Sequence, residues 1–355
     1  MMKSDQSHDS QNKSEKLAQI KKILENDVMG CDMKLSLFVS SAITYRYDSC
    51  CVPFPIQFKN HQLKEKDINR LTTAIEKIPS LHDLISILSD TKQEFNLDSD
   101  VIEILYWLFV EARGPCLKTV PKQDFGKILS KSPQETQIKG PTHIFQVEYR
   151  SNSSQEAAFQ SHSKDFNTSF AFHGTKLFYL HNILHQGLQQ HLSKNALFGE
   201  GLYLSSELNV SLPYSRNGLG WQNSIIGDSM SCLALCEFVE HPIFSKHCLN
   251  KDTRKRTELP EKYIIVTNND CVRLRYLIVY ANKTKTGNAI GPRTIQNHDN
   301  GNNFWSTWFN FRMLSIIYLL ILVLVGFNDS PYIKYLKKNF MKKVHDNFRM
   351  LLGRE

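Results

Sequence analysis

The sequence predicts an α+β protein: a helical first third, a β-rich middle part and one apolar segment near the C-terminal end. Three observations lead to this prediction. Apolar residues recur at helical spacing over residues 16–115. Beyond residue 141 they alternate with polar residues in short runs, a pattern typical of strands. The third observation is a charge-free apolar run over residues 313–327. A chain of 355 residues is long enough for two modest domains, and we expect two.

The helical domain is predicted over residues 16–115, after a polar segment, residues 1–15, that is predicted to be disordered. A further helix is expected to begin at Asp98-Ser99-Asp100, which can cap it, and to end at Gly114-Pro115. We interpret the apolar stripes of these helices as the core of a bundle rather than a ligand groove. The apolar residues that define the earlier helices are Leu17, Ile20, Ile23 and Leu24, then Leu35, Leu37, Phe38, Ala42 and Ile43, then Ile68, Leu71, Ile75 and Ile78.

Residues 116–141 contain lysine and proline and are predicted to form a linker, and the β-rich domain follows over residues 142–287. Strands are predicted near residues 144–148, 170–173, 201–205, 231–240, 263–267 and 273–280, and helices over residues 178–188 and 207–214.

Cysteines and histidines do not indicate a metal site. The eight cysteines are scattered without repeated CxxC pairs, which suits a reducing compartment. His181 and His185 have the helical spacing of a zinc pair, but Asn182 follows the first, so the His-Glu-x-x-His pattern is absent. We expect both to be exposed or capping residues, and no bound metal.

The net charge of +8 arises partly from two basic clusters, residues 246–262 and 334–349. The first lacks interleaved aromatic residues for base stacking, and the second follows the apolar segment. We interpret both as solvated, and no nucleic acid partner is expected.

The apolar segment, extended over residues 305–327, is predicted to be a single transmembrane helix. About 23 residues at ~1.5 Å each span ~34 Å, enough to cross a bilayer. Arg312 would cost up to about 3 kcal/mol at mid-membrane, but eleven strongly apolar residues at about 0.5 kcal/mol each outweigh it. A buried core helix is the alternative.

Residues 288–304 are rich in Asn and Gly and are predicted to be a flexible tether. The first 15 residues lack the apolar core of a signal peptide, so we expect a tail anchor with the bulk of the chain in the cytosol. Residues 328–355 would then be a lumenal basic tail. The lysines of that tail disagree, because the positive-inside rule favours the cytosolic side for them.

Two short blocks have the composition of a pocket for a flat ring that carries a primary amide. In the first, His173 ends an apolar strand and Gly174 follows, where the missing side chain lets a ligand pair with backbone. In the second, Tyr203 lies on a short strand, and Tyr214 follows eleven positions later. Two aromatic faces and backbone partners suit nicotinamide. Each tyrosine could instead be a core aromatic, and His173 an ordinary strand histidine.

Four ordered blocks resemble the catalytic blocks of the poly-ADP-ribose polymerase family of diphtheria-toxin-like ADP-ribosyltransferases. From about Leu35 to the apolar segment, the chain is most similar to the tail-anchored, mono-ADP-ribosylating type of the endoplasmic reticulum. The resemblance implies a split antiparallel sheet, NAD as co-substrate and no metal. The blocks are His173-Gly174, Gly201-Leu202-Tyr203, Ser211 with Tyr214, and Tyr263 within Lys262-Tyr263-Ile264-Ile265-Val266-Thr267-Asn268-Asn269.

The resemblance also implies roles for these residues. His173 would hydrogen-bond a ribose hydroxyl of NAD, and the backbone of Gly174 would pair with the nicotinamide carboxamide. The hydroxyl of Ser211 would hold the same carboxamide, unless it is simply a solvated helix serine. Tyr203 and Tyr214 would form the two sides of the nicotinamide slot, with stacking worth about 1 kcal/mol each beyond burial.

Tyr263 bears on the length of the product. It lies thirteen residues before Tyr276, where polymerising members of the family carry glutamate. A phenol, with a reference pKa of about 10, does not supply a full negative charge near neutral pH. The resemblance therefore implies catalytic roles for His173, Tyr203 and Tyr263 in a single transfer rather than chain elongation.

The expected function is that of a membrane-anchored enzyme that transfers one ADP-ribose from NAD to proteins, itself included, and releases nicotinamide. The resemblance implies stress-sensing kinases of the endoplasmic reticulum and nuclear-import factors as acceptors, and a link to the unfolded protein response. It implies the endoplasmic reticulum membrane, with the nuclear envelope as an alternative, as the location. The competing hypotheses are a catalytically weak module that binds NAD or ADP-ribose, and a helical scaffold for tethering.

Overall fold

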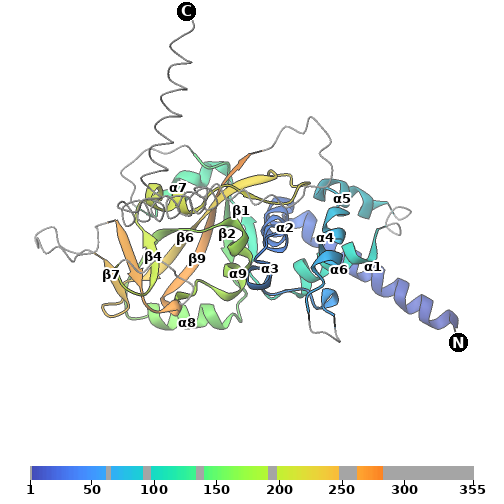
Figure 1. Ribbon diagram of the computed structural model, residues 1–355, viewed down its shortest axis with the longest axis horizontal. Helices are drawn as coiled ribbons and strands as arrows, with labels where there is room; N and C mark the ends of the chain where they lie inside the picture. Colours follow the sequence, from blue (N-terminus) through green and yellow to red (C-terminus); the bar gives the residue numbers. More distant parts are fainter. Residues whose placement is uncertain are drawn as a thin grey trace, which may run out of the picture. The chain divides into compact units, whose positions relative to one another are not determined.

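The computed structural model describes residues 2–60, 65–90, 97–132, 140–190, 198–247 and 262–282 (Figure 1). They belong to one compact unit, residues 1–288. The predicted tether, transmembrane helix and basic tail, residues 288–355, lie outside the described residues. Among the helices that are described, none combines the length and apolar character needed to span a bilayer.

The first third of the chain is helical, as predicted, and its helices gather at one end of the unit in Figure 1. The elements are α1 (Met2–Asn26), α2 (Val28–Ala42), α3 (Tyr47–Cys50), η1 (Ile56–Phe58), α4 (Ile68–Glu76), α5 (Leu81–Ser89), α6 (Ser99–Tyr106) and the π-helical turn η3 (Trp107–Glu111).

Short polar side chains fix where these helices begin. Of the three residues predicted to cap a helix at 98–100, Asp98 is the cap, because its carboxylate accepts a hydrogen bond from the amide of Asp100 at 2.9 Å. Asp67 caps α4 in the same way, and Ser80 caps α5. The carboxylate of Asp27 caps α2. Each cap satisfies an amide that has no partner within its helix.

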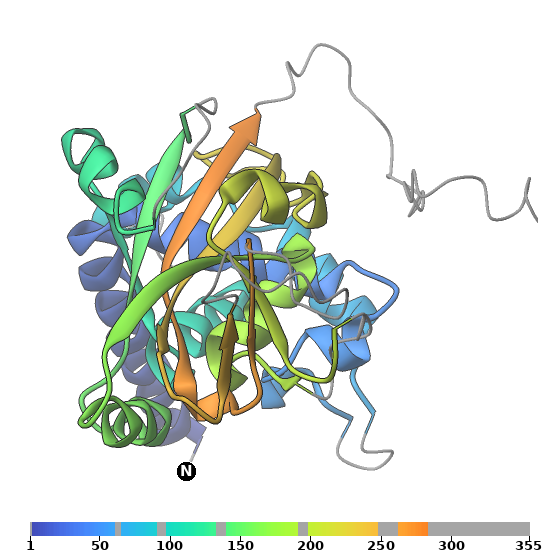
Figure 2. The ribbon, with the colours of Figure 1, turned by 90° about the vertical axis from the view of Figure 1, so that its left-hand side faces the viewer.

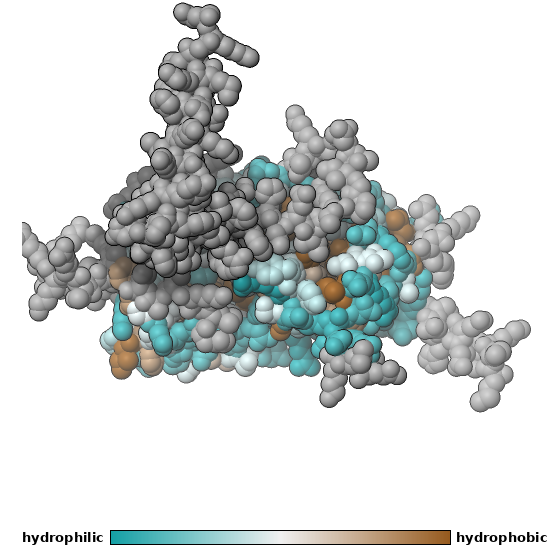
Figure 3. Space-filling view, in the orientation of Figure 1, coloured by the Kyte–Doolittle hydropathy of each residue, from teal (hydrophilic) through white to brown (hydrophobic). Residues whose placement is uncertain are grey.

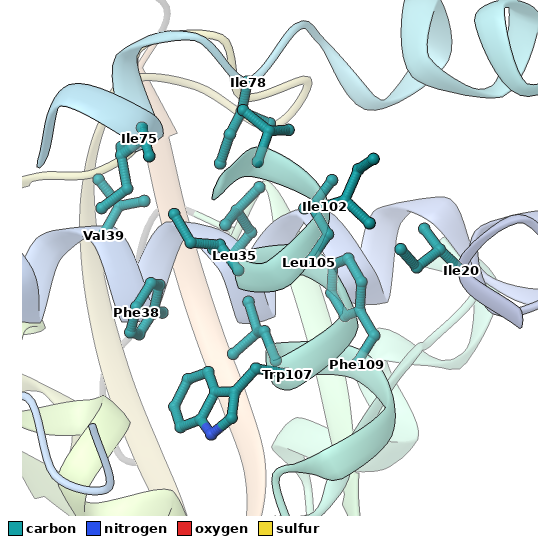
Figure 4. Packing of buried hydrophobic residues seen from close by; sticks show 14 of the residues in the cluster. Ile20, Leu35, Phe38, Val39, Ile75, Ile78, Ile102, Leu105, Trp107 and Phe109 are labelled. Atoms are coloured by element: carbon teal, nitrogen blue, oxygen red, sulfur yellow. The ribbon is translucent and has the colours of Figure 1, made fainter. Parts of the chain in front are cut away.

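Helix α2 has no solvent face: every residue from Gly30 to Ala42 is buried. One side packs into the helical core, where Figure 4 shows Leu35 and Phe38 among apolar side chains of the other helices. The rings of Phe38 and Trp107 lie 5.5 Å apart. Met33 and Leu37, on the other side, belong to the core beneath the sheet. Helix α2 is therefore shared by both hydrophobic cores.

The second part forms one antiparallel sheet in the order β1-β2-β9-β6-β3-β4-β8-β7, with β5 paired to β6 (Figure 2). The predicted α+β class is confirmed. The split expected of the sheet corresponds to β3 and β4, which are joined at the single pair Phe172–Ser205. The strands are β1 (Cys116–Thr119), β2 (His143–Glu148), β3 (Thr168–Gly174), β4 (Leu202–Ser205), β5 (Gly218–Leu219), β6 (Ser229–Val239), β7 (Ser245–His247), β8 (Tyr263–Val266) and β9 (Val272–Asn282).

Short helices flank the sheet, and two consecutive pairs of them correspond to the predicted segments 178–188 and 207–214. They are η4 (Lys122–Asp124), α7 (Phe125–Leu129), α8 (Ser154–Ser163), η5 (Leu177–Tyr179), α9 (Leu180–Gln186), α10 (Leu208–Ser211), η7 (Leu212–Tyr214) and η8 (Asn269–Cys271).

Three expectations need correction. The predicted linker, residues 116–141, contains β1, which pairs with β2 and forms one edge of the sheet. Residues 1–15, predicted to be disordered, lie largely within α1, which begins at Met2. The expected pair of domains forms one compact unit, because α2 and Trp221 join the two cores. In the first and third cases a long-range contact decides the structure.

His181 and His185 are not surface residues. His181 on α9 is 1% exposed, lies edge-on to Phe38 at 5.3 Å between ring centroids, and its Nε2 donates to the carbonyl of Pro53 at 3.0 Å. His185 is half-buried, and its Nδ1 donates to the carbonyl of His181 at 2.8 Å. Burial lowers the pKa of His185 to about 4. Both rings are therefore neutral packing residues between α9 and the helical region.

Candidate active site

His173 lies near the end of β3, next to the point where the sheet splits. Its Nδ1 is 3.0 Å from the carbonyl oxygen of Tyr203. A carbonyl only accepts, so Nδ1 carries the proton, and Nε2 of the neutral ring is left as an acceptor. Burial lowers the pKa of His173, against the opposing effect of this hydrogen bond. The sheet thus presents a neutral imidazole with a fixed tautomer.

Gly174 follows directly, and the structure requires a residue without a side chain there. A Cβ at this position would overlap the carbonyl oxygen of Ser211 and lie 2.9 Å from the Cβ of Tyr214. The backbone of the segment 211–214 therefore crosses Gly174 at closer range than any other residue permits. We call this segment the slot wall.

Ser211, at the end of α10, is buried, and its hydroxyl donates to the carbonyl of Phe172 at 3.1 Å. With its proton engaged, Oγ keeps only its acceptor lone pairs. In this arrangement it can accept from the NH2 of a carboxamide, whereas donation to the carboxamide oxygen requires release of Phe172. The predicted proximity of Ser211 to Gly174 is present in the structure.

Tyr203 and Tyr263 share one face of the β4–β8 pair. Tyr203 lies opposite Ile265 and Tyr263 opposite Ser205, two residues along, so both side chains point the same way. The hydroxyl of Tyr203 donates to the carbonyl of Gly199 at 2.7 Å. The two tyrosines are diagonal neighbours across β4 and β8, and β4 is the strand that borders β3 and His173.

Tyr214, the second predicted side of the slot, is 53% exposed. Its ring is one of few large apolar groups on the surface of the described residues, and the face in Figure 3 is mostly hydrophilic around scattered apolar residues. Phe198 is another, 41% exposed, with its ring 5.9 Å from that of Tyr263. Both exposed aromatic groups follow His173 in the chain.

Two serines that sequence reasoning missed hold the slot wall in place. The hydroxyl of Ser215 accepts from the amide of Thr175 at 3.1 Å, and the hydroxyl of Ser231 on β6 donates to the carbonyl of Ser215. Only the position of Ser215, next to Tyr214, gave any signal in the sequence. These bonds tie the end of the slot wall to the residue after Gly174 and to strand β6.

The six predicted site residues thus surround one junction, with His173 bonded to the Tyr203 backbone and Gly174 against the slot wall. They do not line the two surface cavities of about 480 and 610 Å³, which both border α8. The described part of the chain contains no group of three or more metal-ligating side chains.

Comparisons with known proteins cover most of the chain. A family described as "Poly(ADP-ribose) polymerase catalytic domain" matches residues 122–255, and one described as "ARTD15 N-terminal domain" matches residues 22–109. Tyr263 lies beyond the first match. Protein mono-ADP-ribosyltransferase PARP16 of Mus musculus is 32% identical over 318 residues, 86% of this chain and 92% of the relative.

Two other relatives are also similar to this chain. PARP16 of Homo sapiens is 32% identical over 320 residues, with the same coverage of 86% and 92%. Protein mono-ADP-ribosyltransferase PARP8 of Mus musculus is 23% identical over 291 residues, which are 72% of this chain and 30% of that protein.

Proposed function

This chain belongs to the poly(ADP-ribose) polymerase family, and from that premise we propose that it is an NAD-dependent protein mono-ADP-ribosyltransferase. One observation carries the proposal: the bond from Nδ1 of His173 to the carbonyl of Tyr203, which leaves Nε2 as an acceptor beside the side-chain-free Gly174. A ribose hydroxyl needs such an acceptor, and a carboxamide ring needs such a gap.

In the proposed complex, the nicotinamide ring lies against the slot wall with Tyr203 and Tyr214 at its sides. Its carboxamide pairs with the backbone of Gly174 and donates to Oγ of Ser211. Nε2 of His173 accepts from a hydroxyl of the adjoining ribose. These contacts hold both ends of the glycosidic bond, so most of the catalytic effect comes from orientation rather than from acid–base chemistry.

The bond between the ribose C1′ and the nicotinamide nitrogen breaks, and its electron pair leaves with nicotinamide. A nucleophilic side chain of an acceptor protein then forms the new bond to C1′ and loses its proton to solvent. Tyr263 supports a single transfer, because a phenol near neutral pH lacks the charge that would activate a ribose hydroxyl as the next acceptor.

The proposal extends to location and acceptors on the strength of sequence alone. The apolar residues 305–327 support anchoring in the endoplasmic reticulum membrane with the catalytic part in the cytosol. The family resemblance supports stress kinases of that membrane, nuclear-import factors and the enzyme itself as acceptors.

His173→Ala tests the enzyme. Incubation with labelled NAD, followed by mass spectrometry, reports transfer, the modified side chain and the product length together. We expect the variant to lose labelling and keep its fold, because the ring is half-buried and its hydrogen bond is to the carbonyl of Tyr203 alone among the described residues. His162→Ala, on α8, is the matched control and should label normally. Unchanged labelling by His173→Ala would refute the site.

The second candidate is a catalytically weak binding module, because Tyr263 stands where polymerising members of the family carry glutamate. The same incubation separates this module from the enzyme. Reversible, saturable binding of NAD without covalent transfer by the wild-type protein would favour the module.

A further inference from the structure

The connection between β5 and β6, residues 220–227, leaves the sheet and enters the helical region. We call it the docking loop. Its Trp221 is fully buried and belongs to the helical core rather than to the cores of the sheet. The side-chain NH2 group of Asn223 donates to the carbonyl of Ile78 at 2.8 Å. A segment of the catalytic part is therefore packed inside the helical part.

One buried carboxylate of the helical part binds the docking loop. Asp32 on α2 is fully buried; one oxygen accepts from the hydroxyl of Ser224 and the other from the amide of Ile225 at 2.9 Å. Oγ of Ser224 in turn accepts from the amides of Ile226 at 3.2 Å and Gly227 at 3.3 Å. Three successive amides and one hydroxyl are thus fixed, directly or through Ser224, by Asp32.

The docking loop is a short and stiff continuation of the slot wall. Only five residues separate Ser215 from Trp221, and two of them form β5, which pairs with β6. The amide of Gly220, the last of the five, donates to the carbonyl of Asp228 at 3.0 Å. The chain between the docking loop and Tyr214 is therefore short and is paired to β6.

We propose that Asp32 is a positioning residue for the nicotinamide subsite: it holds the docking loop, and through it the slot wall, at the distance from Gly174 that a flat amide ring requires. This inference rests on the proposed function. Helix α2 is buried on all sides, so the carboxylate has a rigid support. The helical part then contributes to substrate binding without touching substrate.

Asp32→Asn tests the proposal with little change in volume. Ser224 and Ile225 donate to different oxygens of Asp32, and the amide side chain replaces one of these oxygens by an NH2 group, which faces either the amide of Ile225 or a hydroxyl that already accepts two amides. The readout is the Kd of benzamide, a flat ring with a primary amide, for the full chain by calorimetry. We expect benzamide to bind about tenfold more weakly, which corresponds to ~1.4 kcal/mol.

Asp27→Asn is the matched control. Asp27 also ties the helical part to the sheet, because its carboxylate accepts from the amide and the hydroxyl of Thr119, both at 2.7 Å. That contact lies at strand β1, at the far edge of the sheet order from β4. We expect this variant to lose thermal stability, as Asp32→Asn does, but to bind benzamide like the wild type.

The outcomes separate as follows. Weaker binding by Asp32→Asn alone supports the proposal, whereas equal changes in both variants, or none in either, overturn it. If Asp32→Asn does not fold, Ser224→Ala, which leaves the bond from Ile225 to Asp32 in place, is judged by the same criterion. A wild-type protein that binds benzamide but transfers no ADP-ribose contradicts the proposed function and still tests Asp32. A wild-type protein that does not bind benzamide contradicts both.

Discussion

Replacement of Gly174 by alanine measures how closely the slot wall crosses the backbone. The new Cβ would lie 2.9 Å from the Cβ of Tyr214, and ordinary contact begins at 3.4 Å, so the wall must recede by about 0.5 Å. The overlap with the carbonyl oxygen of Ser211 demands more. Overpacking of this kind costs ~1–3 kcal/mol of stability, and a 1 Å misplacement of binding groups costs ~100-fold in rate.

We therefore expect Gly174→Ala to lower automodification by at least about tenfold while the protein stays folded. The assay is incorporation of labelled NAD, with thermal unfolding measured in parallel. Gly126→Ala is the control, because a Cβ at Gly126 in α7 would meet nothing within 4 Å. Its stability should be unchanged or slightly higher. Wild-type activity in Gly174→Ala would show that the slot wall does not bind the substrate, and the reasoning would fail.

Two further predictions concern charge. Since burial lowers the pKa of His173, the neutral ring and the activity should persist as pH falls below the usual value of about 6.5, and disappear only on reaching the lowered pKa; an ordinary midpoint in the pH–rate profile would contradict this. Burial opposes ionisation of Glu156, but Arg275 and Arg273 hold its pKa below its usual range, so its stabilisation is present above about pH 4.3 and lost as pH falls through the lowered pKa. Glu156→Gln should therefore reduce the free energy of unfolding at neutral pH by about 3 kcal/mol, measured in urea, because Arg273 is almost fully buried; a loss near zero would mean that the ion pair is exchangeable for hydrogen bonds.

Local patterns predicted much of the fold and the site. Short apolar runs located the strands that carry His173 and Tyr203, and the polar residues before an apolar helical pattern located the cap within Asp98-Ser99-Asp100. The spacing of Ser211 and Tyr214 after Tyr203 placed both on one short segment, and that segment crosses Gly174. In each case the sequence pattern lies within a few residues of the element or contact that it predicts.

Features that depend on distant partners could not be predicted in the same way. Strand β1 is four residues long and exists because β2 pairs with it. His181 is buried because Phe38 and the carbonyl of Pro53 meet it from another part of the chain. Nothing near Trp221 in the sequence indicates that it packs among helices. Composition and periodicity describe a residue's neighbours in the sequence. Strand β1, His181 and Trp221 depend instead on residues that are distant in the sequence and close in space.

The burial of α2 has a consequence for biosynthesis. Asp32 and Ser224 are 192 residues apart, so at ~5–20 residues per second the ribosome needs about 10–40 s to deliver the partner after the helix has emerged. Throughout that interval Asp32 and the side of the helix that packs against the sheet, with Met33 and Leu37, lack most of their partners. We expect chaperones that hold unfolded chains to protect the helix during this time. Synonymous codons that slow elongation between these positions would lengthen the exposure.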